Sequence, residues 1–316
     1  PDKVCDQISG AILDACLVQD KNSRVGVECV GGKDKIFITG EITTKAKINI
    51  EEITRRVLRD VGYRTDYEII NNIGMQSPDI AQGVDNGGAG DNGMMFGYAC
   101  DDTPEFLPEA MVILQKFARL YDELRIKDER FLSDGKAQIT GLYDDNFNLV
   151  RIKTFTVCYQ NIETDREETD KIIKNMILNI YPRIDEILIN PTGKFLIGGF
   201  DADAGMTGRK IVVDTYQSFA NVGGGCMNGK DPSKVDVSGA YKARELAVRF
   251  LKKFKLKWCE VQLSYAIGKA EPLAIYINSN IGTIEPTQDL YEECKPRNIN
   301  MSGINYEKQA QFGHFR

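Results

Sequence analysis

The chain has 316 residues, a formal net charge of −6, 42% hydrophobic residues and 27% charged residues. These values are typical of a soluble globular protein with two or three cores, at roughly 150 residues per domain. The acidic charge argues against nucleic acid as a partner, and no apolar run reaches the length of a membrane span. Eight scattered cysteines without a C-x-x-C pair predict reduced thiols in a cytoplasmic protein, and the single histidine, His314, excludes a histidine-rich zinc site.

The first third of the chain alternates between helical and strand patterns. Spacing and turn residues predict, in order, a helix at 6–17, strands at 24–30 and 36–42, and a helix at 50–61 that ends at Gly62. From 76 to 93 the pattern dissolves into a loop with Pro78 and five glycines, which predicts a mobile segment. Its G-x-G-x-x-G match at 88–93 is rejected as a dinucleotide site, because a polar loop precedes it instead of a buried strand.

The remaining two thirds repeat the same kinds of element. The patterns predict, in order, a helix at 108–125, strands at 136–143 and 149–159, a helix at 167–180, short strands near 187 and 195, a helix at 235–251, and strands at 258–266 and 273–278. Two strands and a helix recur along the chain, which favours an α+β class and suggests internal repetition. The last thirty residues are polar, and no element is predicted there.

Residues 205–236 carry the strongest functional signal. They place four cations and two aspartates beside glycine-rich turns, in a chain that is acidic as a whole: Arg209, Lys210, Lys230, Lys234, Asp231 and Asp236. Fixed arginine and lysine donors offset the charge of a highly charged anion such as triphosphate. On composition alone, a basic surface patch on an acidic protein is an equally good interpretation.

The segment 224–231 tests whether this region is a P-loop. It satisfies G-x-x-x-x-G-K, but Asp231 follows Lys230 where a P-loop has the hydroxyl that binds Mg²⁺. Pro232 comes next, where the helix of a P-loop would already be running. The segment is therefore predicted to be a glycine turn that faces phosphate and not a Walker A motif. A nucleotide triphosphatase that uses Lys230 stays as a second interpretation.

Other residues of chemical interest have ordinary interpretations when each is taken alone. Asp2 is more often a solvated residue or a helix cap than a magnesium ligand. Glu28 and Glu41 alternate with apolar neighbours, so a solvated strand face is the commoner interpretation for both. Phe195 is more often a core residue than a platform for adenine.

Longer blocks of sequence carry a resemblance to a known family. In chain order they read PDKVCDQISGAILDA at 1–15, GEITT at 40–44, QSPDIAQGVD at 76–85, GAGDNGMMFGYA at 88–99, INPTGKFLIGG at 189–199, DADAGMTGRKIVVDTY at 201–216, GKDPSKVD at 229–236 and SYAIGKAEP at 264–272. Together these blocks resemble the S-adenosylmethionine synthetase (methionine adenosyltransferase) family over nearly the whole chain.

The resemblance implies an architecture and a reaction. It implies three similar α+β domains related by pseudo-threefold symmetry, with flat sheets packed against helices, at 1–79, 87–197 and 198–316. It also implies a homodimer or homotetramer with active sites at the interface between subunits. In the implied reaction, the sulfur of L-methionine attacks the ribose C5′ of ATP and displaces triphosphate, which is cleaved to phosphate and diphosphate before release.

The resemblance further implies roles for individual residues in ATP and metal binding. It assigns Mg²⁺ to Asp2 and Asp236, and K⁺ to Glu28. The ATP-binding residues that it implies are Asp134, Lys136, Lys194, Phe195, Asp203, Arg209, Lys210, Cys226 and Lys230. Among these, the cations that would contact the leaving triphosphate and be catalytic are Lys136, Arg209, Lys210 and Lys230.

The second substrate has its own implied set. The methionine-binding residues are Glu41, Gln76, Asp91, Asp203 and Lys234. The segment 76–86 matches a gating loop over the active site, with Gln76, Asp79 and Asp85 in it, which agrees with the mobility predicted from its composition.

The chain also departs from the pattern of the family it resembles. The family motif is G-H-P-D-K and this sequence starts at Pro1, so we expect the histidine that contacts ATP to precede it in the full-length protein. A non-catalytic regulatory partner that lacks this histidine is the competing interpretation. The pattern GGGAFSGKD reads GGGCMNGKD here, and the segments after Asp85 and before the final FGHF are shorter than usual.

Overall fold

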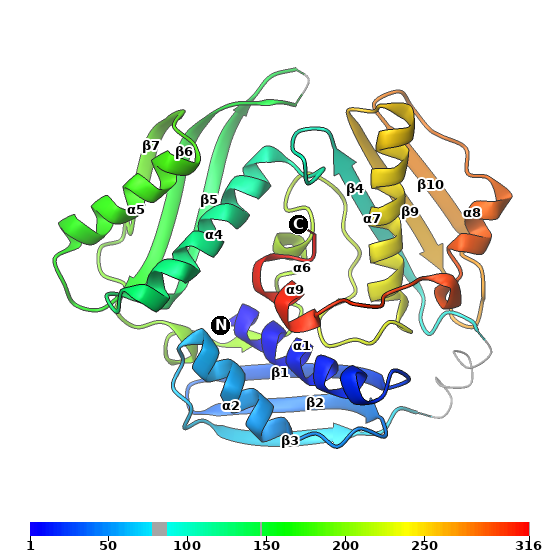
Figure 1. Ribbon diagram of the computed structural model, residues 1–316, viewed down its shortest axis with the longest axis horizontal. Coiled ribbons are helices and arrows are strands. Elements are labelled where there is room, and N and C mark those ends of the chain that lie inside the picture. Colours follow the sequence, from blue (N-terminus) through cyan, green and yellow to red (C-terminus); the bar gives the residue numbers. More distant parts are fainter. Residues whose placement is uncertain (78–86, 146, 316) are drawn as a thin grey trace.

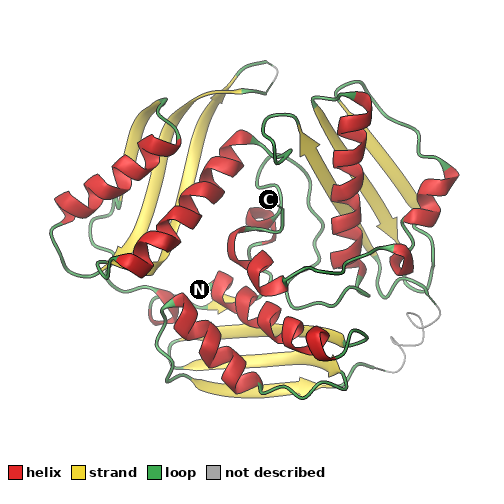
Figure 2. Ribbon diagram, viewed as in Figure 1, coloured by secondary structure: helices red, strands yellow, loops and turns green. Residues whose placement is uncertain are grey.

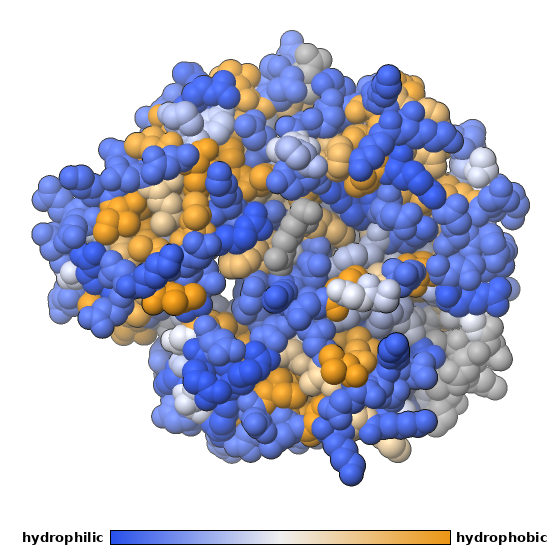
Figure 3. Space-filling view, in the orientation of Figure 1, coloured by the Kyte–Doolittle hydropathy of each residue, from blue (hydrophilic) through white to orange (hydrophobic). Residues whose placement is uncertain are grey.

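The structure, a computed structural model, describes residues 1–77, 87–145 and 147–315. Within them the strands form three sheets, each with helices on one side, arranged around a common centre (Figure 1, Figure 2). On the helix-bearing side, hydrophilic side chains predominate and hydrophobic ones gather in separate patches (Figure 3). The predicted α+β class with three similar sheet-and-helix units is confirmed.

The first sheet has the strand order β3-β2-β1-β8. Its strands are β1 (Arg24–Gly32), β2 (Lys35–Thr43), β3 (Glu68–Gly74) and β8 (Gly205–Met206), and α1 (Asp2–Gln19) and α2 (Ile50–Val61) cover one side. In β1 the side chains of Val25, Val27 and Cys29 are buried under α1, while the alternate residues face the other side of the sheet. Helix α2 ends at Gly62 as predicted, because glycine adopts the left-handed conformation (φ 87°) that closes it.

The second sheet has the order β5-β6-β7. Its strands are β5 (Phe131–Tyr143), β6 (Leu149–Asn161) and β7 (Ile184–Ile189), and its helices are α4 (Glu109–Lys127) and α5 (Arg166–Ile180). The prediction of a strand near 195 is wrong. Asn190 and Gly193 have positive φ values of 40° and 100°, which turn the chain away from the sheet after β7.

The third sheet has the order β10-β9-β4. It contains β4 (Gly93–Cys100), β9 (Trp258–Tyr265) and β10 (Ala274–Ser279), with α7 (Val235–Phe254) and α8 (Gln288–Glu293). The sequence patterns missed β4. Gly97 lies so near α7 that an added Cβ would be 1.9 Å from the carbonyl carbon of Ala243, so close packing of the strand on the helix requires glycine. The rejection of the dinucleotide motif is confirmed, because Gly93 begins a strand and not a helix.

Two strands cross the predicted domain boundaries. Strand β4, from the predicted segment 87–197, pairs with β9, and β8, from the predicted segment 198–316, pairs with β1. Two of the sheets are therefore completed by a strand from another segment. The predicted domain boundaries divide the sequence, whereas each of these two sheets combines strands from two of the predicted segments. The boundaries therefore stay a prediction.

The end of the chain closes the centre of the molecule. The short elements η1 (Gly199–Asp201), α6 (Ile211–Asp214), η2 (Pro296–Asn298) and α9 (Tyr306–Phe312) complete the fold, with α6 and α9 between the three units (Figure 1). Helix α9 packs on α1, where Asp14 accepts hydrogen bonds from the backbone N–H groups of Tyr306 and Glu307. In the described part of the chain, the helices are too short or too polar to cross a membrane.

Candidate active site

The two halves of the segment 205–236 meet along one edge of β1. Strand β8 pairs with the C-terminal end of β1, and Lys230 forms an isolated bridge with Gly26 farther along it. The N–H of Val27 donates to the carbonyl of Gly229 at 3.0 Å. The edge of one strand therefore brings together cations that are about twenty positions apart in the sequence.

Asp2 lies at the β8 end of this edge. Its Oδ1 accepts a hydrogen bond from the N–H of Met206 at 2.9 Å and lies 3.6 Å from Nη1 of Arg209, and its Oδ2 is paired with Lys210. Burial alone would raise the pKa of the Asp2 carboxyl, but the hydrogen bonds from Lys210 and Met206 outweigh it and hold the pKa below its ordinary value. Asp2 is thus a nearly buried carboxylate that stays charged between two cations.

Lys230 and Asp236 form a second ion pair, at the start of α7. Their side chains are only 22% and 11% exposed, so the pair is largely shielded from bulk water. Gly225 passes directly over this carboxylate, where an added Cβ would lie 1.9 Å from Oδ1 of Asp236. The glycine-rich segment therefore serves close packing around Asp236, and α7 begins at Val235, after Pro232, unlike the helix of a Walker A motif.

A third polar group lies next to Lys230 and contains three of the predicted methionine-binding residues. Nζ of Lys234 is 3.3 Å from Oε1 of Glu41 and 2.9 Å from Oδ2 of the buried Asp231. Nε2 of Gln76 donates to the same Oε1 of Glu41 at 3.3 Å. Gly26 leaves room for this arrangement, because its ideal Cβ would lie 3.2 Å from Cε of Lys234. The fold therefore brings together Glu41 from β2, Gln76 from the segment after β3, and Lys234 from the start of α7.

Cys226 lies between the first two groups. An added Cβ on Gly208 would be 2.8 Å from its Sγ, which places the thiol against the turn that carries Arg209. Burial raises the pKa of Cys226 to about 12, and the nearby charges of Asp6, Lys230 and Glu28 also act on it. The thiol is therefore neutral at ordinary pH. Glu28 is exposed on β1, on the side of the sheet away from the helices.

The other predicted site residues lie elsewhere. Lys136 is exposed on β5 in the second sheet, and Asp134 accepts a hydrogen bond from the N–H of Gly199 at 2.7 Å. The surface residue Lys194 pairs with Glu163. Asp91 and Asp203 are exposed, but each is close in the chain to the site: an ideal Cβ on Gly93 would lie 3.9 Å from Oδ1 of Asp236, and one on Gly32 of β1 would lie 3.6 Å from Cβ of Ala204. Asp79 and Asp85, predicted for the gating loop, lie outside the described residues. Among the described residues, the structure thus brings most of the predicted set to the edge of β1 and leaves Lys136, Lys194 and Phe195 beside the second sheet.

Sequence reasoning missed a buried ion cluster beside Asp2. Nζ of Lys3 donates to Oδ2 of Asp6 at 3.0 Å and is also paired with Asp214. Asp6 in turn accepts a hydrogen bond from the N–H of Gly208 at 2.9 Å. Burial raises the pKa of Asp214 to about 6, although Lys3 opposes the shift. The i, i+3 spacing of Lys3 and Asp6 on the first helix was the only signal in the sequence.

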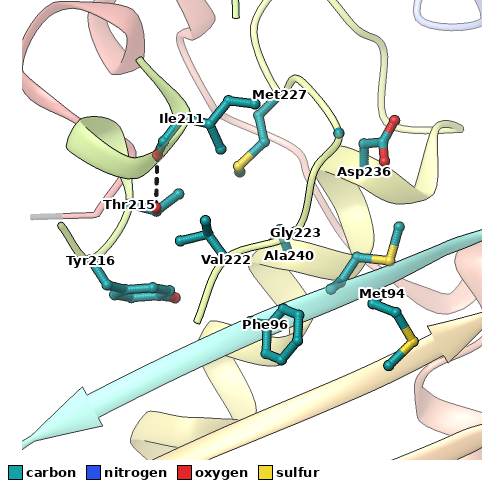
Figure 4. Close-up of a pocket in the computed structure, with 12 residues that line it drawn as sticks. Met94, Phe96, Ile211, Thr215, Tyr216, Val222, Gly223, Met227, Asp236 and Ala240 are labelled. Carbon is teal, nitrogen blue, oxygen red and sulfur yellow. Dashed lines mark hydrogen bonds between the residues drawn. The ribbon is translucent and has the colours of Figure 1, made fainter. Parts of the chain in front are cut away.

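A small cavity lies behind the glycine-rich segment 224–231, which we call the Lys230 turn. Its volume is about 20 Å³, it is lined mainly by apolar side chains, and Met227 extends toward Ile211 and Val222 there, with Asp236 at its edge (Figure 4). This volume holds about one water molecule, so the cavity is packing space and not a substrate site. Within the described ranges, no group of three histidine, cysteine or acidic residues is arranged to hold a metal ion.

Cations beside glycine turns are suited to an anionic ligand, and carboxylates are the side chains that Mg²⁺ takes together with substrate phosphates, so the site fits the class of enzymes that bind nucleotide phosphates. Comparison with known families gives the particular class. Models of the N-terminal, central and C-terminal domains of S-adenosylmethionine synthetase match residues 1–80, 86–195 and 197–316. The chain belongs to the S-adenosylmethionine synthetase family, which confirms the resemblance.

Individual relatives agree with this membership. The chain is 38% identical to an S-adenosylmethionine synthase of Prochlorococcus marinus (strain MIT 9515) and 39% identical to one of Staphylococcus epidermidis (strain ATCC 12228 / FDA PCI 1200). Each match covers 100% of this chain and 90% of the relative. A solved structure of an unusual S-adenosylmethionine synthetase from Campylobacter jejuni is similar with a TM-score of 0.88 at 29% identity, over 99% of this chain and 91% of that one.

Proposed function

We propose that this chain forms S-adenosylmethionine from ATP and L-methionine. The sulfur of methionine forms a bond to C5′ of the ribose, the bond from C5′ to the triphosphate oxygen breaks, and water then cleaves the triphosphate to phosphate and diphosphate. Family membership supports the two substrates and the synthetase activity. The observation that carries the proposal is the row of paired cations and carboxylates along β1, in the fold that this family has.

The row of charges matches the demands of the leaving group. Triphosphate leaves C5′ with about four negative charges, so fixed positive charge lowers the barrier if it is in place before the reaction. Arg209 and Lys210 are paired with Asp2, and Lys230 is paired with Asp236. These pairs keep the cations at the edge of β1, so only the ends of their side chains have to turn from carboxylate to phosphate oxygens.

The metal proposal follows from the donor set. Family membership implies dependence on a divalent metal and a monovalent cation in general. We propose Mg²⁺ at Asp2 and Asp236, because Mg²⁺ takes one or two carboxylates and completes its coordination with substrate phosphates and water. Two nearly buried, charged carboxylates fit that requirement. Bound there, Mg²⁺ would supply charge neutralisation of the departing triphosphate.

The group around Lys234 suits a free amino acid. Glu41 offers a carboxylate for the ammonium of methionine, and Lys234 offers an ammonium for its carboxylate. Gln76 holds the Glu41 carboxylate by a hydrogen bond. Asp91 and Asp203 are proposed as further contacts to methionine, and both are exposed and available.

The second sheet is proposed to complete the site from another copy of the chain. Its predicted ATP-binding residues are set apart from the β1 edge, as described above. On the first sheet, Val30 lies opposite both Phe37 and Met206, and the three side chains are 37%, 36% and 37% exposed on the side away from the helices. An apolar row of this kind on an open sheet face is suited to burial against a second copy. We propose a homodimer or homotetramer with shared active sites.

Shared sites predict recovery of activity in mixed oligomers. Lys136→Ala and Lys230→Ala are each expected to be nearly inactive alone. If the two lysines of one site come from different copies, a mixed dimer has one site with both substitutions and one intact site. Random assembly makes half of the dimers mixed, so co-expression is expected to restore about a quarter of wild-type activity. Sites built within one copy would leave no intact site, and no recovery would be measured.

The monovalent cation is proposed to be K⁺ at Glu28. Glu28→Gln keeps the shape of the side chain and removes its charge. The variant is expected to need at least several-fold more K⁺ for half-maximal stimulation, because a carboxylate oxygen is a stronger ligand for a hard cation than an amide oxygen. Glu68→Gln, at an exposed strand glutamate on β3, is the control. An unchanged K⁺ titration of Glu28→Gln would place the monovalent site elsewhere.

One assay tests the function as a whole. Full-length protein with ATP, L-methionine, Mg²⁺ and K⁺ is expected to release S-adenosylmethionine, phosphate and diphosphate in equal amounts. Phosphate release without the sulfonium product would support the nucleotide triphosphatase, and the absence of both would support a non-catalytic partner. The cytoplasmic location stays a prediction from the sequence.

A further inference from the structure

The buried ion cluster of Lys3, Asp6 and Asp214 joins separate parts of the β1 edge. Lys3 follows Asp2 directly in α1, and its ammonium lies between the carboxylates of Asp6 and Asp214. The side chains of Asp6 and Asp214 are 0% and 3% exposed, whereas Lys3 is 26% exposed. Burying two carboxylates this deeply costs desolvation free energy, which a cation or a hydrogen-bond donor next to each carboxylate has to offset.

Within this ion cluster, Asp214 makes the most contacts with segments of the proposed triphosphate site. Its backbone N–H donates to the carbonyl of Lys210 at 2.8 Å, which closes the turn that carries the Arg209–Lys210 pair. Its carboxylate is paired with Lys3, and the side chain of Asn228 lies near enough to act on the pKa of this carboxyl, which it lowers. Asn228 is itself buried, two positions before Lys230.

The end of the chain fixes Asp214 from the other side. Its carbonyl accepts a hydrogen bond from the N–H of His314 at 2.8 Å, and an added Cβ on Gly313 would lie 3.2 Å from the same oxygen. Phe315 stacks on Tyr216, with the ring centroids 5.2 Å apart. Asp214 is therefore anchored to the tail at the centre of the three units and has little freedom to move.

We propose that Asp214 is a positioning residue that sets the relative placement of Asp2, the Arg209–Lys210 turn and the Lys230 turn. It touches no phosphate itself and acts through Lys3, its own backbone and Asn228. This inference rests on the proposed function, because it concerns the same triphosphate site. A merely structural ion pair is the competing account, and it predicts a loss of stability without a change in the kinetics of the folded enzyme.

The test compares two aspartates in the same protein. Asp214→Asn keeps the shape of the side chain and removes the charge that holds Lys3. Asp14→Asn is the matched control, because Asp14 lies on the same helix as Lys3 and holds α9 through two backbone hydrogen bonds. Both variants are expected to unfold at a lower temperature than the wild type. Turnover and Michaelis constants are measured well below both unfolding transitions.

The kinetic results are expected to differ. Asp214→Asn is expected to lose on the order of 10²-fold in turnover with ATP and in hydrolysis of added tripolyphosphate, with the Michaelis constant for methionine unchanged. Asp14→Asn is expected to keep wild-type kinetics. If Asp214→Asn shows wild-type turnover in both assays, the proposal is overturned and the residue is structural. Wild-type protein that makes no S-adenosylmethionine would instead overturn the proposed function.

A second variant keeps the proposal testable if Asp214→Asn does not fold. Asn228→Ala removes the link to the Lys230 turn and leaves the pair of Lys3 with Asp214 intact. A smaller loss, about 10-fold in turnover, is expected, again with the methionine constant unchanged. Equal losses in turnover and methionine binding, or no loss in either, would contradict a role in placing the phosphate cations.

Discussion

Lys230→Ala is expected to reduce turnover by about 10²- to 10³-fold, which corresponds to about 2.7–4 kcal/mol of transition-state stabilisation. The largely buried Lys230 ammonium faces Asp236, the proposed metal ligand, on the edge of β1. Alanine removes charge that offsets the departing triphosphate and also leaves Asp236 without its partner. The Michaelis constant for methionine is expected to change little, because the contacts of Lys234 and Glu41 do not involve Lys230. Steady-state kinetics with each substrate varied in turn measures both quantities.

Lys242→Ala is the matched control for this change. Lys242 is also a largely buried lysine, 10% exposed, which pairs with Glu245 on α7 and with Glu293 on α8. Its loss is expected to lower stability and to leave turnover within about twofold, because it lies among structural contacts outside the β1 edge. Similar losses of turnover in both variants would show that Lys230 stabilises the structure around α7 and does not contact the triphosphate.

Asp2→Asn is expected to lower turnover by about 10²-fold and to raise the Mg²⁺ concentration for half-maximal activity at least about 10-fold. The amide oxygen can still accept the hydrogen bond from Met206, so the backbone of β8 is expected to stay in place. The lost charge is the one that holds Lys210 and that would bind the metal. A Mg²⁺ titration at saturating ATP and methionine separates the metal effect from a general loss of activity.

Asp165→Asn provides the corresponding control. Asp165 caps α5 through a hydrogen bond from the N–H of Glu167, on the second sheet's helices. Its replacement is expected to leave the Mg²⁺ titration unchanged. If Asp2→Asn also shows a wild-type Mg²⁺ titration, Asp2 is a partner of Lys210 only, and the proposed metal site must be moved.

The sequence predicted those parts of the fold in which one strong local signal dominates. Helix α2 has a clear apolar stripe, an asparagine cap and Gly62 at its end, and its bounds came out as predicted. Strand β4 was missed because glycines and methionines hide its period, and its burial depends on α7, more than a hundred residues away. The final helix, α9, depends on contacts with α1 that no local pattern carries.

The residue types of the site could be predicted from the sequence, but the contacts between residues that are distant in the sequence could not. The composition of residues 205–236 predicts an anion site, and the structure places the cations of this segment on one edge of β1. The approach of Glu41 to Lys234 joins residues almost two hundred positions apart, and only the family resemblance suggested it. The role of Asp214 was not predicted, because this residue ends a short apolar run and its partner Lys3 is 211 positions away in the sequence.

A crystal structure of the protein with Mg²⁺, methionine and an ATP analogue that cannot be hydrolysed would show whether the edge of β1 binds the triphosphate. We expect Arg209, Lys210 and Lys230 to turn from their carboxylate partners and to lie within hydrogen-bonding distance of phosphate oxygens, with Asp2 and Asp236 on the metal. A triphosphate bound away from the β1 edge, with the three cations still in their present ion pairs, would contradict the proposed role of this edge.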